Sequence, residues 1–159
     1  MVKRHYILVL GIGNEYCRDD AVGLIVARRL KERAHDHVSI FEHNGEGTAL
    51  MEKWRNSAGV ILIDAVHSNQ KAGTIFRFEA HQQAIPAQFF HYSSHAFGLA
   101  DAIELARTLK QLPPRLIVYG IEGKNFAAGS GLSAEVKKAV STVVESVRQE
   151  IADFPKVKS

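Results

Sequence analysis

The sequence contains a single cysteine, Cys17, among its 159 residues. One cysteine excludes the intrachain disulfide framework on which many small secreted proteins depend, and it suits a reducing compartment. We therefore expect the protein to be cytoplasmic.

Long apolar runs are also missing. The run from Tyr6 to Ile12 is too short for a signal-peptide core or a membrane span, and its composition is typical of a strand. The net charge is only +3 and the basic residues are not clustered, so nothing favours nucleic-acid binding. The length predicts one domain over residues 1–159, and the absence of a surplus apolar pattern favours a monomer.

What the sequence does contain is an alternation of buried strands and amphipathic helices. Several runs of β-branched and aliphatic residues have the pattern of strands buried on both faces, and apolar residues recur at helical spacing between them. This order predicts an α/β fold with a mostly parallel sheet. The expected strands span residues 6–10, 38–41, 59–64 and 116–121, and the expected helices span residues 21–33, 48–54 and 133–152.

The stretch after Asp64 departs from this alternation. Residues 73–78 have a strand pattern, but the loop before them is too short for a helical crossover, so we expect an antiparallel edge strand. Residues 80–92 lack periodicity and are interpreted as a functional loop. A further helix is predicted from residue 93 to residue 112, with Ser93 or Ser94 as its cap.

Three potential metal ligands are expected at one edge of the sheet. Asp20 follows the first strand, Asp64 follows a later strand, and His95 opens the helix predicted from residue 93. Ligands of open α/β sheets bind outside the carboxyl ends of the strands. Two carboxylates and one imidazole suit nickel, zinc, iron or manganese, and they leave coordination positions open for an incoming partner or substrate.

Each of these residues also has a purely structural interpretation. Asp19 or Asp20 could cap the first helix, and Asp64 could accept hydrogen bonds from loop amides after its strand. His95 is harder to explain in this way, because a positive charge at a helix start opposes the helix dipole. His91 is the best additional ligand, and Cys17 could serve as a soft ligand or a nucleophile.

The glycines of Gly11-Ile12-Gly13 suggest a second hypothesis, a dinucleotide-binding enzyme. The third glycine of that fingerprint would fall at Tyr16, and Glu42 after the second strand is its only support. The signatures of phosphate-binding loops, of the common zinc peptidases and of serine hydrolases are absent.

The motifs together resemble those of the hydrogenase maturation proteases, nickel-dependent endopeptidases that trim the large subunit of [NiFe]-hydrogenases. The resemblance covers nearly the whole chain. It rests on residues 10–14 with 19–23, Ile63-Asp64-Ala65 with Gly73-Thr74, Ser94-His95 with residues 98–100, and residues 118–122.

This resemblance implies a five-stranded twisted sheet between helices, a single-domain three-layer sandwich. It also implies that Asp20, Asp64 and His95 are the metal-binding and catalytic positions. Such enzymes remove a C-terminal extension from the large-subunit precursor after nickel insertion, so the nickel would be carried by the substrate rather than stored as a cofactor. The sequence departs from the family pattern at Cys17, which is usually aliphatic, and at residues 43–47, which lack the family's acidic-glycine turn. A non-catalytic scaffold that docks on the nickel-loaded subunit would use the same three residues.

Overall fold

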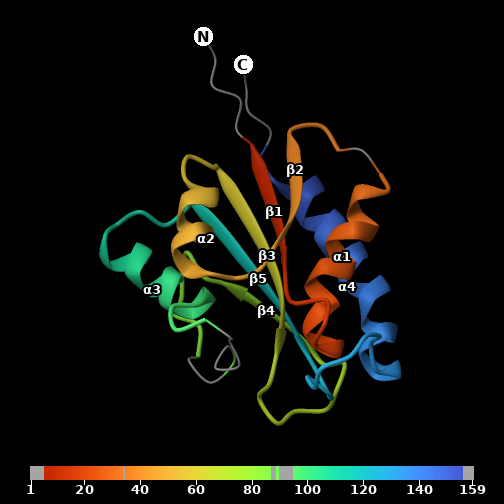
Figure 1. The fold of residues 1–159 in the computed structure, drawn as a ribbon. Helices are drawn as coiled ribbons and strands as arrows, with labels where there is room; N and C mark the ends of the chain where they lie inside the picture. The colour runs from red at the N-terminus through yellow and green to blue at the C-terminus, as the bar shows by residue number, and fades with distance from the viewer. Residues whose placement is uncertain (1–5, 34, 87–88, 90–94, 156–159) are drawn as a thin grey trace.

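Five strands form one twisted sheet in the computed structural model, which describes residues 6–33, 35–86, 89 and 95–155 (Figure 1). The order across the sheet is β2-β1-β3-β5-β4. All neighbouring strands are parallel except β4, which pairs with β5 in the antiparallel direction at one edge. The mostly parallel sheet and its antiparallel edge strand are thereby confirmed. The strands are β1 (Ile7–Ile12), β2 (Val38–His43), β3 (Gly59–Val66), β4 (Ile75–Glu79) and β5 (Arg115–Glu122).

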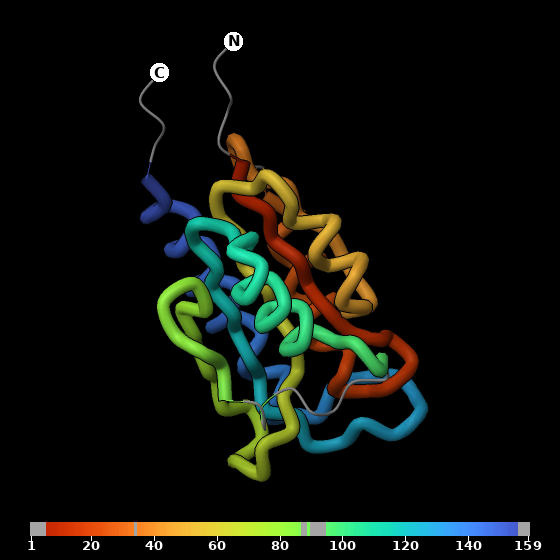
Figure 2. The backbone as a smooth tube through the Cα atoms, turned by 90° about the vertical axis from the view of Figure 1, so that its left-hand side faces the viewer, coloured from red at the N-terminus to blue at the C-terminus, as the bar shows by residue number. Residues whose placement is uncertain are grey.

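Two helices cover each face of the sheet. α1 (Val22–Lys31) and α4 (Ala134–Asp153) lie on one face, and α2 (Gly47–Trp54) and α3 (Leu99–Thr108) lie side by side on the other (Figures 1 and 2). Because strand side chains alternate between faces, each buried strand supplies both cores. In β1, for example, Val9 packs toward α1 and α4, whereas Leu8 and Leu10 pack toward α2 and α3.

The start of α3 differs from the prediction. The helix begins at Leu99 rather than at residues 93–95, and Gly98 is its N-cap residue. The Asp101 carboxylate accepts a hydrogen bond from the Gly98 backbone N–H at 3.0 Å, which fixes this later start. His95 therefore lies in a bend before the helix and does not open it. The predicted cap residues Ser93 and Ser94 fall outside the described residues, as does His91.

The third strand is longer than predicted. β3 continues to Val66, so Asp64 lies within the strand and not after it, where it faces Gly120 of β5. The described part of the predicted functional loop, residues 80–86, is made of turns and irregular chain. Within the described ranges, no helix is long and apolar enough to span a membrane.

Candidate active site

The turn after β1 is packed so tightly that three positions require glycine. A Cβ at Gly11 would overlap the carbonyl oxygen of Gly23, and a Cβ at Gly13 would overlap that of Asp20. A Cβ at Gly23 would in turn overlap the carbonyl oxygens of Ile12 and Ile63. The glycines therefore bring the start of α1 into backbone contact with β1 and β3.

This contact places Asp20 at the carboxyl end of β1. Asp20 belongs to a short 3-10 helix, η1 (Arg18–Ala21), which leads into α1. Its carboxylate is half-buried and accepts a hydrogen bond from the Asn14 backbone N–H at 3.1 Å. Burial raises the pKa of Asp20, and the Asn14 bond and the charge of His95 partly offset that rise.

Asp64 is the only residue of β3 with intermediate exposure, whereas the other residues of the strand are buried. By the alternation of the strand, its side chain points to the face covered by α2 and α3. Its carboxylate accepts a hydrogen bond from the Ala65 backbone N–H at 2.8 Å. Burial first, and the negative charge of Asp20 second, raise the pKa of Asp64 well above its usual value.

His95 approaches the same rim from the segment before α3. Its Nε2 lies 3.0 Å from the backbone carbonyl oxygen of Asn44. Since a carbonyl oxygen only accepts, the His95 Nε2 is the donor in this contact. The Asn44 loop is itself ordered by the Gly47 backbone N–H, which donates to the Phe97 carbonyl oxygen at 2.8 Å.

The loop of residues 43–47 thus holds His95, although its sequence lacks the family turn. The His43 Nδ1 accepts the Gly45 backbone N–H at 2.9 Å, and the Asn44 side chain accepts that of Glu46 at 3.0 Å. Glu46 caps α2 by accepting hydrogen bonds from the backbone N–H groups of Thr48 and Ala49. These hydrogen bonds define the shape of the loop beside the site.

The three predicted residues therefore share one electrostatic environment. The charge of Asp20 acts on Asp64, and that of His95 acts on Asp20. Among the described residues, however, no three His, Cys, Asp or Glu side chains form a group that could hold a metal ion. The ligand and catalytic roles of Asp20, Asp64 and His95 remain predictions.

Neither acidic residue of the turn caps α1. The N-cap residue of α1 is Ala21, which has no side-chain acceptor. Asp19 is fully buried and points away from the helix, toward the loop between β5 and α4, where it binds Lys124, Asn125 and Ser133. The capping interpretation of the aspartates is wrong at α1.

A second buried carboxylate was not predicted. Glu122, at the end of β5, accepts hydrogen bonds from the backbone N–H and the hydroxyl of Ser68. It thereby holds the loop after β3 against β5, near the end of the strand that carries Asp64. Its position directly after an apolar strand run is the signal that could have found it.

The dinucleotide hypothesis loses its two supports. Glu42 forms ion pairs with Arg28 and Lys31, at 2.7 and 3.5 Å, so its carboxylate is not available to bind a ribose. The space beside Gly13 is filled by the Asp20 backbone, so the glycine turn serves packing within the protein. Cys17, the residue before η1, is half-buried, and its backbone pairs with that of Gly129 in an isolated parallel β-bridge.

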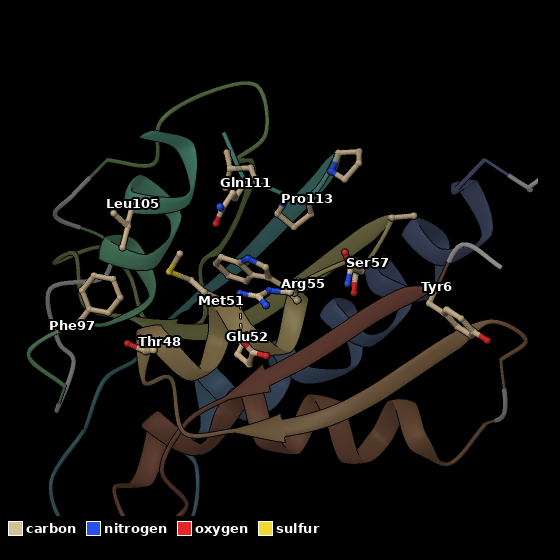
Figure 3. A pocket seen from close by; sticks show the side chains of 15 residues that line it. Tyr6, Thr48, Met51, Glu52, Arg55, Ser57, Phe97, Leu105, Gln111 and Pro113 are labelled. Atoms are coloured by element: carbon tan, nitrogen blue, oxygen red, sulfur yellow. Dashed lines mark ion pairs between the residues drawn. The ribbon is translucent and has the colours of Figure 1, made fainter. Parts of the chain in front are cut away.

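A large groove lies apart from these residues. It has a volume of about 1210 Å³ and runs beside α2 and α3, with Met51 and Leu105 on its walls and the ion pair of Glu52 and Arg55 at its rim (Figure 3). Phe97, two residues after His95, lines it together with Tyr6 and Pro113. Asp20 and Asp64 are not among its lining residues.

A family model described as hydrogenase maturation protease matches residues 24–150. The chain belongs to the hydrogenase maturation protease family. The hydrogenase 2 maturation protease of Escherichia coli (strain K12) is 30% identical over 145 residues, covering 89% of this chain and 87% of that protein. The family assignment of this maturation protease thus rests on similarity over most of the chain and not on any single residue.

Solved structures agree with this family assignment. The solution structure of an endopeptidase from Escherichia coli superposes with a TM-score of 0.82 at 27% identity, covering 95% of this chain and 94% of that chain. The hydrogenase maturating endopeptidase HybD from E. coli superposes with a TM-score of 0.78 at 28% identity, covering 93% of both chains. The maturation protease therefore shares both fold and sequence with structurally known endopeptidases.

Proposed function

We propose that this protease removes the C-terminal extension of a [NiFe]-hydrogenase large-subunit precursor after nickel insertion, and that it recognises the nickel carried by that precursor through Asp20, Asp64 and His95. The observation that supports the proposal is the pairwise charge interaction of these side chains, which come from η1, β3 and the segment before α3: Asp20 acts on Asp64, and His95 acts on Asp20. The family relationship supports the substrate. The protein would act in the cytoplasm, as a monomer.

The residue chemistry suits this role. Two carboxylates and one imidazole can complete the coordination of a metal that the partner already holds. A nickel ion shared in this way would polarise the scissile carbonyl or activate a water molecule. Asp20 or Asp64 would then accept the proton of the attacking water, and the raised pKa of both carboxylates suits a proton acceptor.

The decisive experiment compares nickel-loaded and nickel-free precursor. Each form is incubated with the protease, and the products are weighed by mass spectrometry. Loss of a C-terminal peptide from the loaded form alone supports the proposal, whereas equal trimming without nickel contradicts it. Binding of the loaded precursor without any trimming would favour the non-catalytic scaffold instead.

Two histidine variants complete the experiment. His95→Ala should abolish trimming. His37→Asn is the matched control, because His37 is exposed before β2, at the opposite edge of the sheet, and asparagine tolerates its positive φ of 61°. Full activity of His95→Ala would rule out the proposed recognition of nickel.

A further inference from the structure

The side chain of Asp19 is an internal anchor rather than a surface group. It is 0% exposed. One carboxylate oxygen accepts the backbone N–H groups of Lys124 and Asn125, at 2.8 and 2.9 Å, and the hydroxyl of Ser133 at 2.8 Å. The other oxygen accepts the Ser133 backbone N–H at 2.8 Å. Four donors from the loop between β5 and α4 thus converge on one carboxylate.

The turn that Asp19 anchors is the one that carries Asp20. No side chain caps η1 at its N-cap residue, Cys17. Instead, the backbone of η1 is tied to the same loop, because the Asp19 N–H donates to the Asn125 carbonyl at 3.0 Å and the Arg18 N–H donates to the Gly129 carbonyl at 3.2 Å. Figures 1 and 2 show this loop lying beside the turn that precedes α1.

On its other side, η1 rests on the end of β1. The carbonyl oxygen of Asp20 fills the space where Gly13 lacks a side chain. The turn is therefore held between β1 and the loop after β5, and a shift of that loop would move the Asp20 backbone away from Gly13. The position of Asp20 relative to Asp64 depends on this double contact.

A carboxylate is needed for the anchor. An ionised carboxylate only accepts, which matches four donors. An asparagine amide would turn a donor group toward some of these N–H groups and leave them without an acceptor.

We propose that Asp19 is a positioning residue of the protease: its buried carboxylate fixes η1 against the loop of residues 123–133 and so sets where the Asp20 carboxylate lies in the active site. This inference rests on the proposed function insofar as Asp20 acts on the substrate. It assigns Asp19 no contact with the substrate, because its carboxylate is fully buried among loop donors.

The test compares Asp19→Asn with Glu150→Gln. Glu150 is another buried, hydrogen-bonded carboxylate, but it lies on α4 and binds Arg77 and Tyr119, away from the turn. Both variants are assayed on nickel-loaded precursor at equal distances below their own Tm. We expect kcat of Asp19→Asn to fall about 10- to 100-fold with little change in KM, since small misplacements of catalytic groups have such effects. Glu150→Gln should keep its kcat within about twofold.

The only cysteine supplies a readout that needs no substrate. Cys17 directly precedes η1, so the rate at which its thiol reacts with Ellman's reagent reports opening of this turn. We expect Asp19→Asn to react several times faster than the wild type, and Glu150→Gln to react at the wild-type rate. If the wild type leaves loaded precursor uncut, the proposed function fails, while the thiol rates still test the anchor.

A milder variant keeps the proposal testable if Asp19→Asn fails to fold. Ser133→Ala removes only the hydroxyl bond to Asp19 and keeps the backbone bond. It should shift kcat and the Cys17 rate in the same direction as Asp19→Asn, by less. Unchanged thiol rates in both variants, together with a loss of kcat no larger than that of Glu150→Gln, would overturn the proposal.

Discussion

The negative charge of Asp20 raises the pKa of Asp64, after burial the second cause of its shift. A carboxyl whose folded pKa exceeds its unfolded value binds its proton more tightly in the folded protein. Below the usual pKa of 3.8, the Asp64 carboxyl is protonated in both the folded and the unfolded protein and does not affect stability. As pH rises from there through the higher folded pKa, the free energy of unfolding falls, because the unfolded protein loses this proton more readily.

Replacing Asp64 by asparagine should therefore stabilise the protein at neutral pH. Asparagine keeps an acceptor for the Ala65 N–H but has no charge to desolvate. We expect Tm to rise by about 2–4 °C at pH 7, the shift that roughly 1 kcal/mol produces in a domain of this size. The gain should vanish below pH 4, and the variant should not cleave precursor.

Thermal denaturation from pH 3.5 to pH 8 measures this effect. Asp36→Asn, an exposed carboxylate before β2, controls for the loss of one negative charge. A gain that is the same at every pH, or a loss of stability at neutral pH, would contradict the electrostatic explanation.

Gly13→Ala should destabilise the protein through a backbone clash. The new Cβ would overlap the Asp20 carbonyl oxygen, so β1 and η1 must separate. We expect a loss of about 2–3 kcal/mol in the free energy of unfolding, within the range for overpacked sites. Urea denaturation gives the value.

Gly131→Ala is the matched glycine control. Gly131 has a φ of +97°, but an added Cβ would lie more than 4 Å from every described residue other than its chain neighbours, so only the backbone conformation is strained. This variant should lose about 1 kcal/mol, the cost of left-handed backbone for an L-residue. Equal losses at both positions would show that the Gly13 contact is not rigid.

Tyr119 should titrate above the usual range of tyrosines. Its pKa is raised to about 12 by burial and by the negative charge of Glu150, whose carboxylate accepts the Tyr119 hydroxyl at 3.0 Å. In Glu150→Gln, that charge is removed, so the pKa should fall. Absorbance titration at 295 nm against Tyr119→Phe identifies the signal, and an unchanged pKa would exclude the Glu150 charge as a cause.

Addition of NAD should leave Tm unchanged. The Asp20 backbone fills the space beside the glycine turn, so a pyrophosphate cannot bind there. Glu42 is paired with Arg28, so its carboxylate is not available to a ribose. Binding at 100 times Kd would add about 2.7 kcal/mol, a shift that differential scanning fluorimetry detects easily. Such a shift would restore the dinucleotide hypothesis.

The central strands and the edge strand could be predicted because each is a continuous run of similar residues. β1, β3 and β5 are buried on both faces, and the short connection before β4 permits only an edge pairing. The start of α3 was misplaced because serines at residues 93 and 94 are good caps by propensity, while the actual start depends on Asp101. Propensity alone cannot choose between candidate helix starts that lie several residues apart.

The buried polar contacts could be predicted less well. Asp19 binds residues more than 100 positions away, as the separation of 105 to Lys124 shows, and no local pattern contains that information. The burial of Glu150 could have been predicted, because Glu150 falls on the apolar stripe of α4 after Val143 and Val147. A charged residue on such a stripe indicates a buried partner, which here is Tyr119 together with two arginines.

The position of β5 between β3 and β4 has a consequence for synthesis of the chain. β5 is the last strand in sequence, yet it joins β4 to the rest of the sheet, and the donors that hold Asp19 follow it. Because a ribosome releases the N-terminal part first, the early strands must wait with Asp20 unsupported until residues 115–133 emerge. The contacts that hold Asp19 and the η1 turn can thus form only near the end of translation.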